Sequence, residues 1–247
     1  AARAGLTLVV APTQLSHDGI CSPVAVVPDE NGTAESLGAI APIGVFISIP
    51  TLRGAPESSV AAGIGDLLAN PLALRDWSLA AERGLEDLDE RAWKLSVESH
   101  ELISDDLDRS PGESVTDPDF LRRLADALIL SGMAMISSGT SRPASGGEHE
   151  ISHAIDELYQ GRGMHGAQVA FGCIVSLALY EEDTNAFRGT LRTLGLPDHP
   201  GRLGLDEDQL VRVLMAAPDT RPGRFTILEE ANLDESAVRT LVKKIWT

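Results

Sequence analysis

Residues 137–172 read S-S-G-T-S-R-P-A-S-G-G-E-H-E-I-S-H-A-I-D-E-L-Y-Q-G-R-G-M-H-G-A-Q-V-A-F-G and hold three of the chain's six histidines. His149 and His153 are four positions apart, so on a helix they lie on one face. His165 follows a glycine-flanked break at 161–163 and begins a second apolar run. Imidazoles that converge where two helices meet are typical of a metal site, which we expect here. The alternative is that these are surface or core histidines without a ligand.

A carboxylate is expected to complete this site, because catalytic zinc sites commonly combine about three protein ligands with one open position. The candidate is Asp66, which follows two glycines in A-A-G-I-G-D-L-L-A-N at residues 61–70. Glycines allow a backbone to approach its neighbour closely. The alternative is that Asp66 is an ordinary acidic residue favoured by a helix N-terminus.

The segment S-R-P-A-S-G-G at residues 141–147 leads into the histidine-bearing helix. An arginine, serine hydroxyls and main-chain amides at a helix start form a cradle suited to an anion. We therefore expect Arg142 and Ser145 to bind an anionic group of a substrate. The alternative is that this segment is only a connecting loop.

A polar loop, P-T-Q-L-S-H-D-G-I-C-S-P at residues 12–23, follows the apolar run L-T-L-V-V-A at 6–11. Ligands in α/β folds gather at the carboxyl ends of strands, so this loop is placed to contact one. Serine, aspartate and glycine are equally common in turns, and a plain turn is the alternative.

The composition describes an ordinary water-soluble globule, with 43% hydrophobic and 23% charged residues. No apolar run approaches the ~18 residues of a membrane span, so we expect no membrane insertion. The net charge of -17 repels nucleic acid but allows a small anionic substrate in a local positive pocket. Two cysteines are too few for a disulfide framework, and a cytoplasmic location is expected.

The order of the elements predicts an α+β fold, with strands first and roughly eight helices after them. The continuous apolar run at 6–11 predicts a buried strand, the runs at 24–27 and 45–49 predict two further strands, and D-E-N-G at 29–32 predicts a hairpin turn. Apolar residues at helical spacing predict the helices. These are expected at 71–107, 117–130, 169–180, 184–194, 206–215 and 235–245. We divide the chain into residues 1–50 and 51–247.

Five segments together resemble the sn-glycerol-1-phosphate dehydrogenases, of the dehydroquinate synthase, glycerol dehydrogenase and iron-alcohol dehydrogenase superfamily. The lead S-R-P-A-S-G-x-E-H-x3-H is specific to this branch. The resemblance covers nearly the whole chain and keeps the family's order. It rests on P-T-Q-L-S-H-D-G-I-C-S-P, A-A-G-I-G-D-L-L-A-N-x4-R-D-W, S-R-P-A-S-G-G-E-H-x3-H-A-I-D, H-G-A-Q-V-A-F-G and A-P-D-T-R-P-G-R-F-T-I-L.

The resemblance implies reduction of dihydroxyacetone phosphate to glycerol 1-phosphate by NADH or NADPH. It implies one divalent metal held by Asp66, His149 and His165, zinc being expected, with nickel or iron as alternatives. A metal with an open position polarises a carbonyl and stabilises the alkoxide that hydride transfer creates.

The resemblance also implies roles for neighbouring side chains. His153 and Asp18 would contact the substrate as catalytic residues, with the proton coming from His153 or from water. Asp66 would contact the substrate as well. The nicotinamide cofactor would be lined by Thr13, Ser16 and Ser22.

Members of the family carry a nucleotide-binding half before the P-T-x2-S-H-D-G segment. The resemblance therefore implies that residues 1–50 are the end of that α/β half, and residues 51–247 a dehydroquinate synthase-like helical domain for metal and substrate. We expect the chain to be a portion of a longer protein and to form a homo-oligomer. Two rival functions stay open: a dehydroquinate synthase-like lyase acting on a sugar phosphate, and a non-catalytic binding subunit.

Overall fold

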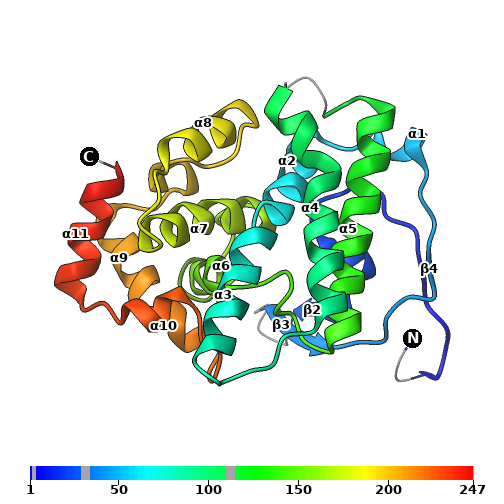
Figure 1. The fold of residues 1–247 in the computed structure, drawn as a ribbon. Coiled ribbons are helices and arrows are strands. Elements are labelled where there is room, and N and C mark those ends of the chain that lie inside the picture. The colour runs from blue at the N-terminus through cyan, green and yellow to red at the C-terminus, as the bar shows by residue number, and fades with distance from the viewer. Residues whose placement is uncertain (2–3, 29–33, 110–114, 247) are drawn as a thin grey trace.

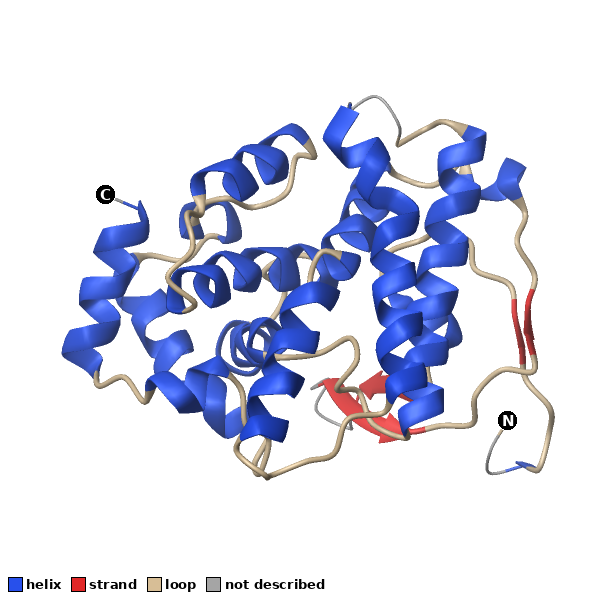
Figure 2. Ribbon diagram, in the orientation of Figure 1, coloured by secondary structure: helices blue, strands red, loops and turns tan. Residues whose placement is uncertain are grey.

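The chain folds as a helical body with four short strands near its N-terminus (Figures 1 and 2). The computed structural model describes residues 1, 4–28, 34–109 and 115–246. Strand β1 (Val9–Val10) pairs in parallel with β4 (Gly44–Val45), and β2 (Val24–Pro28) pairs antiparallel with β3 (Ala34–Gly38). The α+β class is confirmed.

The strands are shorter than the apolar runs predict. The run at 6–11 keeps only β1, and Leu6 and Val9 are 63% and 59% exposed. Of the run at 45–49, only Val45 belongs to β4, and Ile49 begins a helix. Within the part of the chain that the structure describes, β1 pairs with β4 alone, and a two-stranded sheet cannot bury both of its faces, so the prediction of a buried strand at 6–11 was wrong. The hairpin of β2 and β3 is confirmed, and its expected turn at 29–32 lies outside the described residues.

Helices make up most of the rest of the described chain. The short 3-10 segments are η2 (Asp18–Cys21), which lies between β1 and β2, and η3 (Pro200–Leu203) and η4 (Ala217–Thr220), which lie among the later helices. The α-helices are α1 (Ile49–Leu52), α2 (Glu57–Leu67), α3 (Asn70–Glu82), α4 (Glu90–Arg109), α5 (Pro118–Ser138), α6 (Gly147–Tyr159), α7 (His165–Leu179), α8 (Asn185–Thr193), α9 (Glu207–Ala216), α10 (Ile227–Ala231) and α11 (Glu235–Trp246).

Local sequence signals explain where the helices begin and end. Asp117 caps α5 by accepting a hydrogen bond from the Phe120 amide at 2.8 Å, and Pro118 occupies the first turn. Gly139, at φ 69°, ends the same helix in the left-handed conformation. Asp206 and Gln209 form a reciprocal capping box at the start of α9.

Helix α7 lies at the centre of the molecule and packs against α2 and α6 (Figure 1). Most of its residues are buried, as its nearly continuous apolar sequence predicts. Helices α4 and α5 pack along each other on one side, and α9 and α11 pack together on the other. No helix within the described residues is both long and apolar enough to cross a membrane.

Glycines bring α2 and α7 into backbone contact. A Cβ at Gly166 would lie 1.9 Å from the Ala62 carbonyl oxygen, and one at Gly65 would lie 2.5 Å from the Gly166 carbonyl oxygen. No real side chain fits such spaces, so only glycine permits this approach. The approach sets Asp66, the residue after Gly65, beside the first residue of α7.

Candidate metal centre and substrate site

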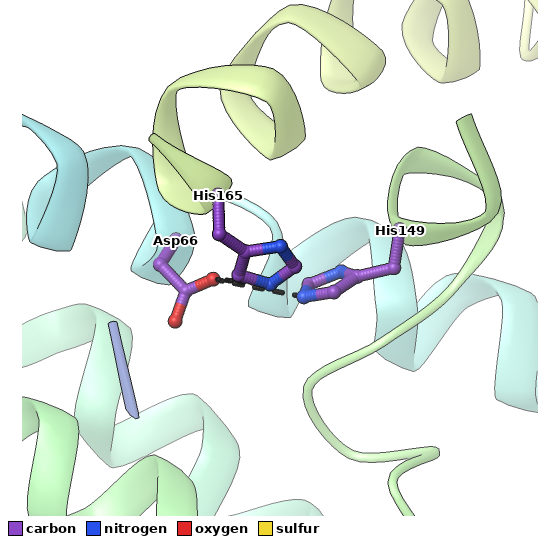
Figure 3. Close-up of side chains that lie close together, drawn as sticks. All are labelled: Asp66, His149 and His165. Carbon is purple, nitrogen blue, oxygen red and sulfur yellow. Dashed lines mark ion pairs between the residues drawn. The ribbon is translucent and has the colours of Figure 1, made fainter. Parts of the chain in front are cut away.

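Three side chains from three helices converge beside the start of α7: Asp66 from α2, His149 from α6 and His165 from α7 (Figure 3). The Asp66 Oδ1 atom lies 3.6 Å from His149 Nε2 and 3.7 Å from His165 Nε2. All three ligand atoms lie within 4.8 Å of one another. Tetrahedral zinc with bonds of about 2.1 Å separates its ligand atoms by about 3.4 Å, so the cluster has the size of a metal site.

The Asp66 carboxylate lacks one partner that a cation would supply. Its Oδ2 atom accepts a hydrogen bond from the Asp18 amide at 2.8 Å. Its Oδ1 atom, which faces both histidines, is buried and has no hydrogen-bond partner among the described residues. Buried carboxylate oxygens are costly without a partner, and the donor set of one oxygen and two nitrogens suits a divalent metal.

Two surface pockets of about 490 and 370 Å³ contain none of these three residues. One lies between α2 and the segment that follows α8, and the other lies beside α3, α4 and α8. The site is therefore assigned from the geometry of its ligand atoms and not from the size of a cavity.

Hydrogen bonds from neighbouring side chains orient both imidazoles. The Glu148 carboxylate lies 3.0 Å from His149 Nδ1, which must donate to it. Ser152 donates its hydroxyl hydrogen to Gln168, so its oxygen accepts from His165 Nδ1 at 3.2 Å. Each Nδ1 atom therefore carries a hydrogen, and each Nε2 atom faces Asp66, where it can offer a lone pair to a cation once it carries no proton.

The electrostatics of the cluster favour a bound cation. Burial raises the pKa of Asp66, but its interactions with His149 and His165 outweigh burial and lower that pKa to about 2. Burial lowers the pKa of His165 to about 4, against the opposing charge of Asp66. Burial also lowers the pKa of His149, but the nearby carboxylates of Asp66 and Glu148 outweigh it and raise that pKa to about 9. At neutral pH Asp66 is therefore ionised and His165 is neutral, as metal ligands must be. His149 is protonated and would release a proton on metal binding.

His153 lies beside the three-residue cluster and not within it. Its ring centroid is 6.4 Å from that of His165, and its Nε2 atom accepts a hydrogen bond from Arg221 at 3.2 Å. Burial and the charge of Arg221 lower the pKa of His153 to about 2. The imidazole is therefore neutral and can hold a substrate group through hydrogen bonds.

Asp18 contacts the cluster through its main chain and points its carboxylate toward α5. The Ser131 hydroxyl donates to Asp18 Oδ2 at 2.8 Å, while the Asp18 amide donates to Asp66. Burial and the negative charge of Asp66 raise the pKa of Asp18 to about 7. His17, which the sequence reasoning missed, lies with its ring centroid 6.1 Å from that of His165.

Of the three residues expected to line the nicotinamide cofactor, Thr13 and Ser16 lie on the loop before η2 and Ser22 directly follows it. Thr13 is exposed, Ser16 is half-buried and Ser22 is buried. The first two lie on the chain just before Asp18. Their relation to a cofactor stays a prediction.

Arg142 does not present its charge to a substrate. Its side chain is 1% exposed and forms a salt bridge with Glu86, through Nε at 2.7 Å and through Nη2. Its Nη1 atom donates to the Phe225 carbonyl at 2.7 Å. Because the guanidinium is buried and its donors serve these partners, the expectation that Arg142 binds a substrate anion was wrong.

Two other arginines occupy the place expected of Arg142. Arg221 donates to the hydroxyls of Ser141 and Ser145, and Arg224 donates to the Ser141 hydroxyl and the Ser145 carbonyl. Ser145 therefore lies in the expected polar cluster, although with different arginine partners. The signal that could have found them is the R-P-G-R sequence at 221–224, two cations close together in a chain of net charge -17.

Comparisons with known proteins agree with the resemblance in the sequence. A family model described as iron-containing alcohol dehydrogenase matches residues 1–56. The chain is 37% identical over 241 residues to a glycerol-1-phosphate dehydrogenase [NAD(P)+] of Cenarchaeum symbiosum, covering 98% of the chain and 66% of that relative. It is 36% identical over 241 residues to the enzyme of the same name from Pyrococcus furiosus, covering 98% of the chain and 68% of the relative.

The solved structures extend the likeness to the fold. A probable glycerol dehydrogenase from Sinorhizobium meliloti 1021 matches with a TM-score of 0.77 at 23% identity, covering 98% of this chain and 70% of that one. Glycerol dehydrogenase from Schizosaccharomyces pombe matches with a TM-score of 0.70 at 18% identity, covering 98% of this chain and 64% of that one. The chain spans about two thirds of the length of the curated relatives that it matches.

Proposed function

The chain belongs to the glycerol-1-phosphate dehydrogenase family, and from this membership we propose that its protein is a metal-dependent, NAD(P)-linked oxidoreductase. The proposed reaction is the reduction of dihydroxyacetone phosphate to sn-glycerol 1-phosphate and its reverse. The observation that carries the proposal is the unpartnered Asp66 Oδ1 atom facing the Nε2 atoms of His149 and His165. We propose residues 51–247 as the metal and substrate domain, and residues 1–50 as the end of a nucleotide-binding domain.

We assign Asp66, His149 and His165 as the metal ligands, with zinc as the first choice and nickel or iron as alternatives. Such a cation, when bound, would polarise the substrate carbonyl and stabilise the negative charge that hydride transfer places on its oxygen. The chain's own contribution is a rigid ligand set. Glu148 and Ser152 hold the two imidazoles in the orientation that ligation needs.

The residues beside the metal ligands are assigned to the substrate. Asp18, whose pKa of about 7 lets it accept or donate a hydrogen bond near neutral pH, would hold a substrate hydroxyl. His153, neutral and turned by Arg221, would orient the ketone end. Thr13 and Ser16, on the chain before Asp18, would contact the nicotinamide cofactor, and we retain Ser22 for the same group.

The direct test is turnover by the intact metal-loaded protein from its source. NADH or NADPH should be consumed in proportion to the glycerol 1-phosphate formed from dihydroxyacetone phosphate. Release of inorganic phosphate from a sugar phosphate, with the nicotinamide cofactor recycled, would instead support the lyase. A metal content near zero per chain, together with no turnover, would support the non-catalytic subunit.

Glu148→Gln is expected to weaken metal binding by about 10- to 100-fold. The glutamine keeps an acceptor for His149 Nδ1 but removes the negative charge that makes the imidazole a stronger ligand. Competition with a chelator would give the metal dissociation constant. Glu157→Gln, an exposed change on the same helix, should leave that constant unchanged. An unchanged metal dissociation constant for Glu148→Gln would show that the charge of Glu148 does not contribute to metal binding.

A further inference from the structure

We propose that Arg221 and Arg224, together with Ser141 and Ser145, form an anion site that binds the phosphate group of the substrate. This inference deepens the proposed function and rests on it for the identity of the ligand. The site takes a phosphate monoester. Arg142, the arginine that the sequence suggested for this role, is buried in its salt bridge with Glu86.

The two arginines are held in position by neutral groups. Arg221 Nη1 donates to Ser141 Oγ at 3.0 Å and to Ser145 Oγ at 2.8 Å. Arg224 Nη2 donates to Ser141 Oγ at 2.8 Å, and its Nη1 donates to the Ser145 carbonyl at 2.5 Å. Arg221 Nη2 donates to His153 Nε2 at 3.2 Å. None of these partners carries a negative charge, since His153 is neutral.

The cations of the anion site have no ion-pair partner among the described residues, although the charges of Glu148 and Glu150 act on Arg221, and those of Glu150 and Glu86 on Arg224, from farther away. Among the described residues, every salt bridge at 4.0 Å or less leaves out Arg221 and Arg224. Burial lowers the pKa of both arginines, and the neighbouring charges of Arg221 and Arg142 help to lower that of Arg224 to about 10. Holding two partly buried cations together is unfavourable, and a bound dianion would offset that cost.

The geometry also leaves donors for a ligand. Each guanidinium has five N–H groups, and the hydrogen bonds described above use three on Arg221 and two on Arg224. The remaining N–H groups have no acceptor among the described residues. Arginine pairs bind phosphate oxygens in a bidentate manner, which adds both energy and directional specificity.

The anion site lies one side chain away from the metal ligands. Arg221 contacts His153, and the His153 ring lies 6.4 Å, centroid to centroid, from the ring of His165. A ligand that reaches both places needs an oxygen for the cation and a phosphate a short distance away. A ketone separated from its phosphate by one methylene group and one ester oxygen has this form. The anion site would therefore select phosphorylated ketones over their unphosphorylated analogues.

The test compares two substrates and one simple anion on the intact metal-loaded protein. Arg221→Ala should raise KM for dihydroxyacetone phosphate by about 10- to 100-fold, which is the loss of a charged hydrogen-bonding group. The kcat/KM for dihydroxyacetone should fall by a smaller factor, because this ketone loses only the orientation of His153 by Arg221 and no phosphate contact. The dissociation constant of inorganic phosphate, from calorimetric titration, should rise as much as KM does.

Three further variants keep the result interpretable. Arg188→Ala removes another half-buried arginine, which bonds to the carbonyls of Asp198 and Ile245, and should leave phosphate binding unchanged. Arg221→Lys keeps the positive charge but loses the planar guanidinium that donates two parallel hydrogen bonds, so it should bind phosphate with intermediate affinity. If Arg221→Ala does not fold, the phosphate affinity of Arg221→Lys tests the anion site in its place. Arg224→Ala should also weaken phosphate binding.

The outcomes separate this inference from the proposed function. Unchanged phosphate binding in folded Arg221→Ala and Arg224→Ala proteins would overturn the anion site. Equal losses for both ketones would also overturn it, since Arg221 would then act only by supporting His153. Phosphate binding that depends on Arg221, in a protein that does not reduce dihydroxyacetone phosphate, would uphold the anion site while the proposed function fails.

Discussion

Gly166→Ala is expected to abolish metal binding and to destabilise the fold by more than ~3 kcal/mol. A Cβ at this position would lie 1.9 Å from the Ala62 carbonyl oxygen and 3.1 Å from that of Ser16. These atoms belong to main chains that cannot rotate away. Helices α2 and α7 would have to separate, and Asp66 would move away from His165.

Urea denaturation and metal analysis of the purified protein would measure both effects. Gly189→Ala is the matched control, because it lies inside α8 with no atom within 4 Å of an added Cβ. That change should be neutral or stabilise the protein by up to ~1 kcal/mol, as alanine favours a helix over glycine. A Gly166→Ala protein with full metal content and normal stability would show that this helix contact does not hold the ligands together.

His165→Ala is the second large effect that we expect. It removes one nitrogen from a three-residue ligand set, and two ligands do not hold a catalytic cation firmly. Metal content should fall to a small fraction of one ion per chain. Activity should fall at least a hundredfold, since the positive charge beside the developing alkoxide is then lost.

A second histidine serves as the control for His165. His199 is exposed and accepts a hydrogen bond from the Gly201 amide at 3.0 Å, far from any ligand cluster of the described residues. His199→Ala should keep its metal and its activity. If His165→Ala retained one ion per chain, the cluster would not be the metal site. The proposed metal-dependent reaction at this cluster would then be wrong.

Arg142 shows the limit of reasoning from adjacent residues. The segment S-R-P-A-S-G-G has the composition of an anion cradle, and Ser145 does lie in a cluster with arginines. The arginines that reach Ser145, however, come from positions 221 and 224, and Arg142 pairs with Glu86 instead. A long side chain in a loop takes the partner that the tertiary structure brings to it, and composition does not indicate which one.

The amino-acid sequence alone determined the features that depend on neighbours along the chain. The capping residue Asp117, the apolar helix from His165 and the α+β order of elements all follow from local propensity and periodicity. The resemblance that indicated the family also rests on short motifs. Only the tertiary structure decided that Asp66 meets His165, because that meeting depends on two backbones in contact at Gly65 and Gly166, which are distant in the sequence. Short-range signals specify helices, whereas non-local packing specifies which helix ends share a site.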